Sequence, residues 1–179
     1  PIIKLIGMKI SDYLKGAFEP WLIAFTTCSS AAALAVNLEA SRKMGASKAI
    51  ASFAIPLGNT INMNGTSIYM GVTAVFAAEV FGIDLTLTQQ FQIVLMGFLA
   101  AVGTAGVPGA GLIMTTLVFT EVGIPLEAVA LIAGIDRILD MIRTSVNVLG
   151  DSLTALVVSK SEGVLGTEPM DQDTVVKEV

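Results

Sequence analysis

The feature that most constrains this chain is a long stretch without formal charge. Residues 85–120 contain no Asp, Glu, Lys or Arg, and from Ala49 to Thr120 the only charged side chains are Glu79 and Asp84. Uncharged spans longer than about 20 residues are typical of segments that cross a lipid bilayer. Charged residues make up 14% of the chain, whereas an ordinary soluble domain has about 25%. The sequence therefore predicts an all-α membrane protein surrounded by membrane lipid.

Composition excludes several other classes of protein. A hydrophobic content of 54% excludes a disordered chain, and 15 acidic against 10 basic residues, without a basic stripe, argue against a nucleic-acid partner. The chain has no His and a single cysteine, Cys28, so zinc clusters, disulfide scaffolds and Ser-His-Asp or Cys-His catalysis are excluded. We interpret Cys28 as a small half-buried residue and expect no enzyme activity. Because the chain opens on Pro1 and shows no secretory signal, we expect it to be a fragment.

Three of the four apolar spans are interrupted by polar or flexible residues. The interruptions lie at residues 27–30 (Thr-Cys-Ser-Ser), at 62–66 (Asn-Met-Asn-Gly-Thr) and at the Gly-rich segment 103–111. Exposed polar backbone in hydrocarbon costs several kcal/mol per group, so such breaks are expected inside protein or beside a cavity. The fourth span, from Leu126 to Val158, reads as one long helix.

The positions of Lys and Arg predict how these spans are oriented. Basic residues flank the first span on both sides, and none occurs between Lys48 and Arg137. This predicts two re-entrant helical hairpins and two transmembrane helices, one of them unwound in the middle, in an inverted-topology repeat. The plain alternative is four ordinary crossings joined by loops. The predicted elements are a first hairpin at about 11–46, a broken transmembrane helix at 49–83, a second hairpin at 87–123, a last transmembrane helix at 125–160 and a polar cytoplasmic tail at 164–179.

The last helix carries a polar stripe, because its polar residues are separated by one, three or four positions. A charged residue at mid-bilayer costs roughly 2.5–3.5 kcal/mol, so the stripe must face a polar interior. Arg grips a carboxylate through two hydrogen bonds, Asp pairs with an ammonium group, and Asp and Asn oxygens suit hard cations. The stripe is therefore suited to a small zwitterion and cations, although pairing of Asp140 with Arg143 could merely neutralise the helix. Its members are Asp136, Asp140, Arg143, Thr144, Asn147 and Asp151.

The three breaks add further binding groups. Ser29 and Ser30 can cap the second arm of the first hairpin, so that its amides point at an anion. Carbonyls freed at 62–66 can coordinate cations, although Asn-Gly also marks simple turns. The segment 103–111 lets backbone approach a ligand, with an ordinary extramembrane loop as the alternative.

Together these motifs resemble the C-terminal part of the dicarboxylate/amino acid:cation symporter family, which includes glutamate and aspartate transporters. The resemblance runs from about Ser11 to Gly163 and implies that residues 1–163 are part of a transport domain. It further implies a multi-pass protein of the plasma or inner membrane, a homotrimer when full length, an elevator mechanism and a second hairpin that acts as a gate.

The resemblance also implies the binding residues. Arg143 would bind the side-chain carboxylate of the substrate, Asp140 its amino group and Asn147 its α-carboxylate. The full implied substrate set is Ser30, Thr66, Val107, Gly111, Asp140, Arg143, Thr144 and Asn147. Na⁺ would be the coupling ion at two or more sites, with no organic cofactor. One implied sodium site comprises Asp151 with backbone at Gly58, Asn62 and Asn147. A second comprises backbone at Thr60, Met63, Ala101, Val102 and Thr104.

Two details of the sequence refine this expectation. Asp140 favours a substrate with an amino group, so we expect an acidic amino acid, glutamate or aspartate, carried into the cell with Na⁺. The alternatives are a C4-dicarboxylate symporter coupled to Na⁺ or H⁺, or a channel or structural membrane module. Asn64 stands where most sodium-coupled members have Asp, a ligand of a third sodium site, so we expect that site to be weakened.

Overall fold

The structure is a computed structural model that describes residues 1–168. Every regular element in this part of the chain is a helix, which confirms the all-α prediction for these residues. Of the tail predicted at 164–179, residues 169–179 lie outside the described part. The ten helices are α1 (Ile2–Leu5), α2 (Ile10–Gly16), α3 (Phe18–Thr27), α4 (Ser30–Lys43), α5 (Lys48–Ile61), α6 (Asn64–Val80), α7 (Leu87–Val102), α8 (Ala110–Val122), α9 (Glu127–Ala133) and α10 (Asp136–Ser161).

Two pairs of helices form hairpins within the predicted ranges. Helices α3 and α4 contact each other and turn at Cys28 and Ser29; α7 and α8 also contact each other and are joined by residues 103–109. Cys28 ends α3 in the left-handed conformation, with φ of 55°. Ser29 then begins α4, because its hydroxyl accepts a hydrogen bond from the Ala32 amide at 3.2 Å and so caps the helix.

The break predicted at 62–66 separates α5 from α6. Helix α5 ends at Ile61, and Asn62 and Met63 have ψ of 65° and 50°, far from the helical value. The chain resumes as α6 at Asn64. Polar residues therefore mark a real interruption between two apolar helices.

The prediction of one continuous helix at 125–160 is wrong. The chain forms α9 and α10, which are separated by Gly134 and Ile135. Glycine holds a helix weakly, and here the Ile135 amide turns back to the Ile132 carbonyl in a short turn instead of continuing the α-helical pattern. The new start places Asp136 where the Tyr69 hydroxyl donates to its Oδ1 atom at 2.7 Å.

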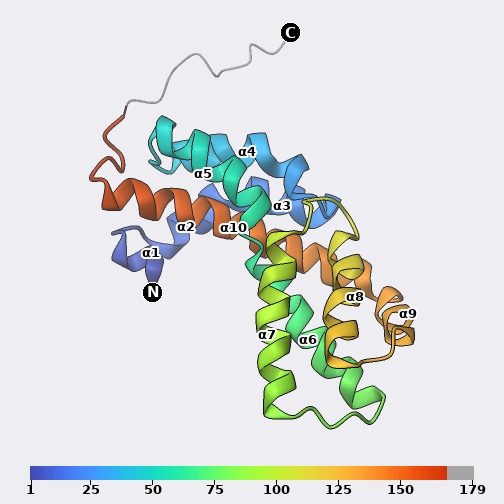
Figure 1. Ribbon diagram of the computed structural model, residues 1–179. Coiled ribbons are helices and arrows are strands. Elements are labelled where there is room, and N and C mark those ends of the chain that lie inside the picture. Colours follow the sequence, from blue (N-terminus) through green and yellow to red (C-terminus); the bar gives the residue numbers. More distant parts are fainter. Residues whose placement is uncertain (169–179) are drawn as a thin grey trace.

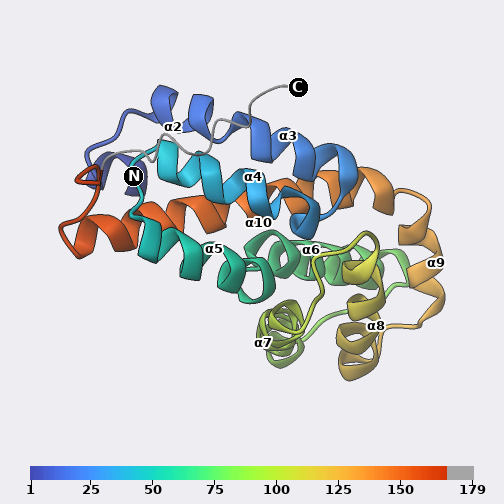
Figure 2. The ribbon, with the colours of Figure 1, turned by 90° about the horizontal axis from the view of Figure 1, so that it is seen from above.

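Helix α10 runs through the middle of the molecule and contacts α3, α4, α5 and α6 (Figure 1). One apolar core is shared by α6, α7, α8 and α9, with Phe119 fully buried within it. A second core joins α5 and the C-terminal half of α10 to the N-terminal helices, around Ile55 and Leu156. Seen from above, the first hairpin with α5 lies on one side and the second hairpin with α6 on the other (Figure 2). Helix α10 links the two groups.

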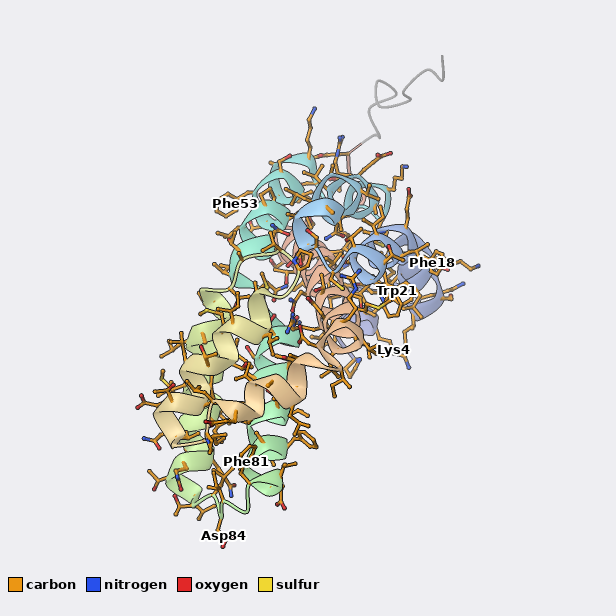
Figure 3. The ribbon with its side chains drawn as sticks, turned by 90° about the vertical axis from the view of Figure 1, so that its right-hand side faces the viewer. Lys4, Phe18, Trp21, Phe53, Phe81 and Asp84 are labelled. Carbon is orange, nitrogen blue, oxygen red and sulfur yellow. The ribbon has the colours of Figure 1, made fainter. Side chains whose placement is uncertain are left out.

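Large apolar side chains cover much of the outer surface. Phe18 and Phe53 are 56% and 70% exposed and project outward from α3 and α5 (Figure 3). Apolar surface of this extent is unusual for a soluble monomer and indicates contact with lipid or with other protein. Among residues 1–168, no single helix combines the length and the hydropathy that a bilayer crossing requires.

Candidate functional site

Helix α10 is polar on its buried side and apolar on its outer side. All six residues of the predicted polar stripe are at most 7% exposed, whereas Ile138 and Ile142 are 63% and 52% exposed. A soluble helix would show the reverse pattern. The expected polar interior is therefore present, and it lies where α10 meets the hairpins and the α5–α6 break.

A small cavity lies beside the buried polar stripe. It is enclosed by the start of α4, the break before α6, the tip of the second hairpin and α10. Its volume of about 10 Å³ is close to the least that holds one water molecule. The lining residues are Ser30, Met63, Thr66, Thr104, Ala105, Gly106, Val107, Gly111, Asp140, Arg143, Thr144 and Asn147. All eight residues of the implied substrate set are among them, although their binding role stays a prediction.

Asp140 is the most highly bonded side chain of the cavity. Its Oδ1 atom lies 2.8 Å from Nη2 of Arg143 and accepts a hydrogen bond from the Thr144 hydroxyl at 2.7 Å. Its Oδ2 atom accepts from the Gly109 amide at 2.8 Å. Asp140 therefore ties the tip of the second hairpin to α10 through one carboxylate.

Arg143 has one satisfied and one unsatisfied terminal nitrogen. Nη2 pairs with Asp140, but Nη1 is buried without a hydrogen-bond partner and lies 3.8 Å from Oδ1 of Asp136. A Cβ atom at Gly111 would overlap the guanidinium, so this close approach requires glycine. The guanidinium therefore retains hydrogen-bonding capacity beside a backbone that could approach a ligand equally closely.

Tyr69 was not predicted as a site residue. The Arg143 guanidinium carbon lies 4.3 Å from the centre of the Tyr69 ring, which is a cation–π contact, and the Tyr69 hydroxyl donates to Asp136. Tyr69 lies three residues after Thr66 and therefore on the same face of α6. That spacing could have identified the tyrosine, whereas its pairing with Asp136 depends on the α9–α10 break.

Asn147 joins α10 to the start of α6. Its Nδ2 atom donates to the Thr66 hydroxyl at 3.1 Å, and its Oδ1 atom accepts from the Gly65 amide at 2.8 Å. Both partners lie in the first turn of α6, so Asn147 fixes the break against the cavity. Met63, which was expected only as a sodium ligand, also lines the cavity.

The residues implied for sodium fall into two places. Asp151 is 2% exposed, and its Oδ1 atom accepts from Nδ2 of Asn62 at 2.8 Å, with Gly58 packed against the carboxylate. In residues 1–168 no three His, Cys, Asp or Glu side chains converge, so a cation site here would combine one carboxylate with amide and backbone oxygens. The other residues implied for sodium lie at the ends of the contacting helices α5 and α7: Thr60, Ala101, Val102 and Thr104.

Asn64, the position that departs from the family pattern, is exposed at the first residue of α6. Its Oδ1 atom accepts a hydrogen bond from the neighbouring Gly65 amide at 2.9 Å, and its side chain lies beside Gly150. The side chain therefore faces α10 near Asp151 without lining the cavity.

The two hairpin tips meet over the cavity. The Ser29 hydroxyl donates to the Gly106 carbonyl at 3.0 Å, and the Ala31 amide donates to the same carbonyl at 3.3 Å. These contacts join residues more than 70 positions apart, and periodicity could not predict them. Together with the bond from Gly109 to Asp140 they hold the second hairpin over the cavity.

Comparison with known proteins gives consistent matches. Residues 1–161 match the sodium:dicarboxylate symporter family. The chain is 41% identical over 93% of its length to a proton/sodium-glutamate symport protein of Bacillus caldotenax, covering 40% of that protein. It is 37% identical over 90% of its length to the proton/glutamate-aspartate symporter of Escherichia coli, covering 37%. It is 42% identical over 84% of its length to human excitatory amino acid transporter 2, covering 27%. The chain therefore spans less than half of each relative.

Proposed function

Since the chain belongs to the sodium:dicarboxylate symporter family, we propose that it is the binding part of a symporter that carries glutamate or aspartate into the cell with Na⁺. The family consists of transporters, not enzymes. The observation that carries the proposal is the buried pair of Asp140 and Arg143, which lines a cavity beneath two hairpin tips.

An acidic amino acid matches both members of this pair. Its side-chain carboxylate would take the Arg143 guanidinium, including the unpartnered Nη1, and its ammonium group would take Asp140. One internal ion pair would thus be exchanged for two ion pairs with the substrate. A C4-dicarboxylate would separate Asp140 from Arg143 and offer the aspartate no cation, and breaking a buried ion pair in that way is costly.

Binding requires the second hairpin to move. A cavity of about 10 Å³ cannot hold an amino acid, so the tip at Gly106 and Gly109 must lift away from Ser29, Ala31 and Asp140. The bonds that break are few and neutral or single charge-assisted ones, so the cost of opening is modest. We propose that this hairpin is the gate and that an elevator movement against a trimeric scaffold carries the loaded site across the membrane.

The charge of the site favours coupling to a cation. The buried stripe contains three Asp and one Arg, and an acidic amino acid adds one further net negative charge. Uncompensated buried charge is expensive, so bound Na⁺ would favour substrate binding. Asp151 with Asn62 and Asn147 supports one Na⁺ site, and the ends of α5 and α7 support a second.

The membrane arrangement is part of the same proposal. The helix pairs α5–α6 and α9–α10 would each cross the bilayer as broken segments, and the two hairpins would enter it from opposite faces. The exposed apolar side chains of these elements would face lipid or the remainder of the transporter. The basic residues at the first hairpin place that end, and the C-terminal tail, in the cytoplasm.

The proposal is tested by uptake into proteoliposomes that contain the full-length transporter. Uptake of radiolabelled aspartate or glutamate should saturate and should require an inward Na⁺ gradient. Uptake that is driven equally by a proton gradient without Na⁺ would contradict the coupling ion. Flux that does not saturate would indicate a channel.

A further inference from the structure

Asn59, in the last turn of α5, lies at the point where three segments of the site meet. A Cβ atom built on Gly106 would lie 3.3 Å from Cβ of Ser30 on one side and 3.5 Å from Nδ2 of Asn59 on the other. The tip of the second hairpin is therefore held between the first hairpin and the Asn59 side chain. Nothing in the sequence reasoning or in the proposed function uses this residue.

The Asn59 amide has an unused oxygen. Its Oδ1 atom is buried and has no hydrogen-bond partner. Leaving a buried acceptor unpaired costs about 1–3 kcal/mol, which a bound ligand would offset. A carbonyl-type oxygen accepts hydrogen bonds or coordinates hard cations.

The electrostatic surroundings favour a cation over a neutral donor. Helices α5 and α7 contact each other, and both end beside this tip, at Ile61 and Val102 (Figure 2). Each C-terminus carries about half a negative charge and carbonyls without helical partners. The chain has no Lys or Arg between Lys48 and Arg137, so no basic side chain of α5, α6, α7 or α8 neutralises them.

We propose that the Asn59 side-chain oxygen is a ligand of a Na⁺ ion bound between the C-terminal ends of α5 and α7. The inference rests on the proposed Na⁺ coupling and adds a side-chain ligand to it. Because Asn59 also touches the hairpin tip at Gly106, Na⁺ at this place would hold the gate closed. Na⁺ affinity would therefore depend on residue 59 even without substrate.

The experiment measures Na⁺ binding by the purified full-length transporter in the absence of substrate, as the rise of the unfolding temperature when NaCl replaces choline chloride. Asn59→Ala should raise the Na⁺ concentration at half-effect about fivefold, as expected for the loss of one favourable oxygen contact. Asn59→Asp, which keeps an oxygen and adds charge, should not raise it. Asn37→Ala is the matched control, because Asn37 Oδ1 is also buried and unpartnered but its amide bonds to the Val148 carbonyl of α10.

The outcomes separate this inference from the proposed function. If the parent transporter responds to Na⁺ and Asn59→Ala responds identically, the role of Asn59 is wrong while Na⁺ coupling stands. If Asn59→Asp loses Na⁺ affinity as much as Asn59→Ala, the residue acts through packing and the inference is overturned. If the parent transporter binds aspartate but shows no response to Na⁺, both fail.

Discussion

Arg143 and Asp140 lie one helical turn apart on α10 and form a buried ion pair with Nη2 and Oδ1 2.8 Å apart. Both side chains are almost fully buried, yet both line the cavity. A pair that only neutralised the helix would have no need to border a cavity or to leave Nη1 without a partner. The pair therefore behaves as two halves of a receptor for a molecule that carries both charges.

Asp140→Ala should separate amino acids from dicarboxylates. Without the carboxylate the ammonium group of aspartate has no partner, so aspartate uptake should fall at least about tenfold more than succinate uptake. Asp136→Ala is the control, because Asp136 is also buried near Arg143 but does not line the cavity. Equal loss of both substrates in Asp140→Ala would refute the ammonium assignment.

Arg143→Cys should shift preference towards neutral amino acids. The change removes the positive charge that attracts a side-chain carboxylate and leaves Asp140 for the ammonium group. Competition of neutral and acidic amino acids against a radiolabelled substrate measures the shift. Retained affinity for aspartate would show that another group binds its side-chain carboxylate.

Gly111→Ala should weaken substrate binding through Arg143. The added Cβ would overlap the guanidinium and displace it, and we expect about a tenfold loss of aspartate affinity. Gly103→Ala in the same hairpin is the control, because its Cβ would meet only ordinary contacts at 3.7 Å. If both variants bind aspartate as tightly as the parent, the close approach of Gly111 to Arg143 does not limit binding.

Asn64→Asp should steepen the dependence of uptake on Na⁺. Asn64 lies at the first residue of α6 beside Gly150 and near Asp151, so a carboxylate there would add a cation ligand and a negative charge. The Hill coefficient for Na⁺ should increase. An unchanged slope would indicate that this position does not bind a coupling ion.

The sequence predicted the interruptions that polar or Gly-rich residues mark. The breaks at Cys28-Ser29, at Asn62-Met63 and at 103–109 all fall within predicted segments, because caps and turn residues act locally. The break at Gly134 was missed, because a single glycine among apolar residues is compatible with a continuing helix.

The contents of the cavity were also partly predictable. Helical spacing placed Asp140, Arg143 and Asn147 on one face, and all three line the cavity. Spacing alone could not find the stacking of Tyr69 on Arg143 or the contact of Ser29 with Gly106. Both depend on how distant helices pack, which a period within one helix does not specify.

The most direct test of the central claim is a binding panel on the purified full-length transporter in NaCl and in choline chloride. The panel compares aspartate with succinate, which lacks the ammonium group, and with asparagine, which lacks the side-chain charge. If Asp140 and Arg143 receive the two charges, aspartate should bind at least about tenfold more tightly than either analogue, and only with Na⁺. Binding of succinate as tight as that of aspartate would contradict the account.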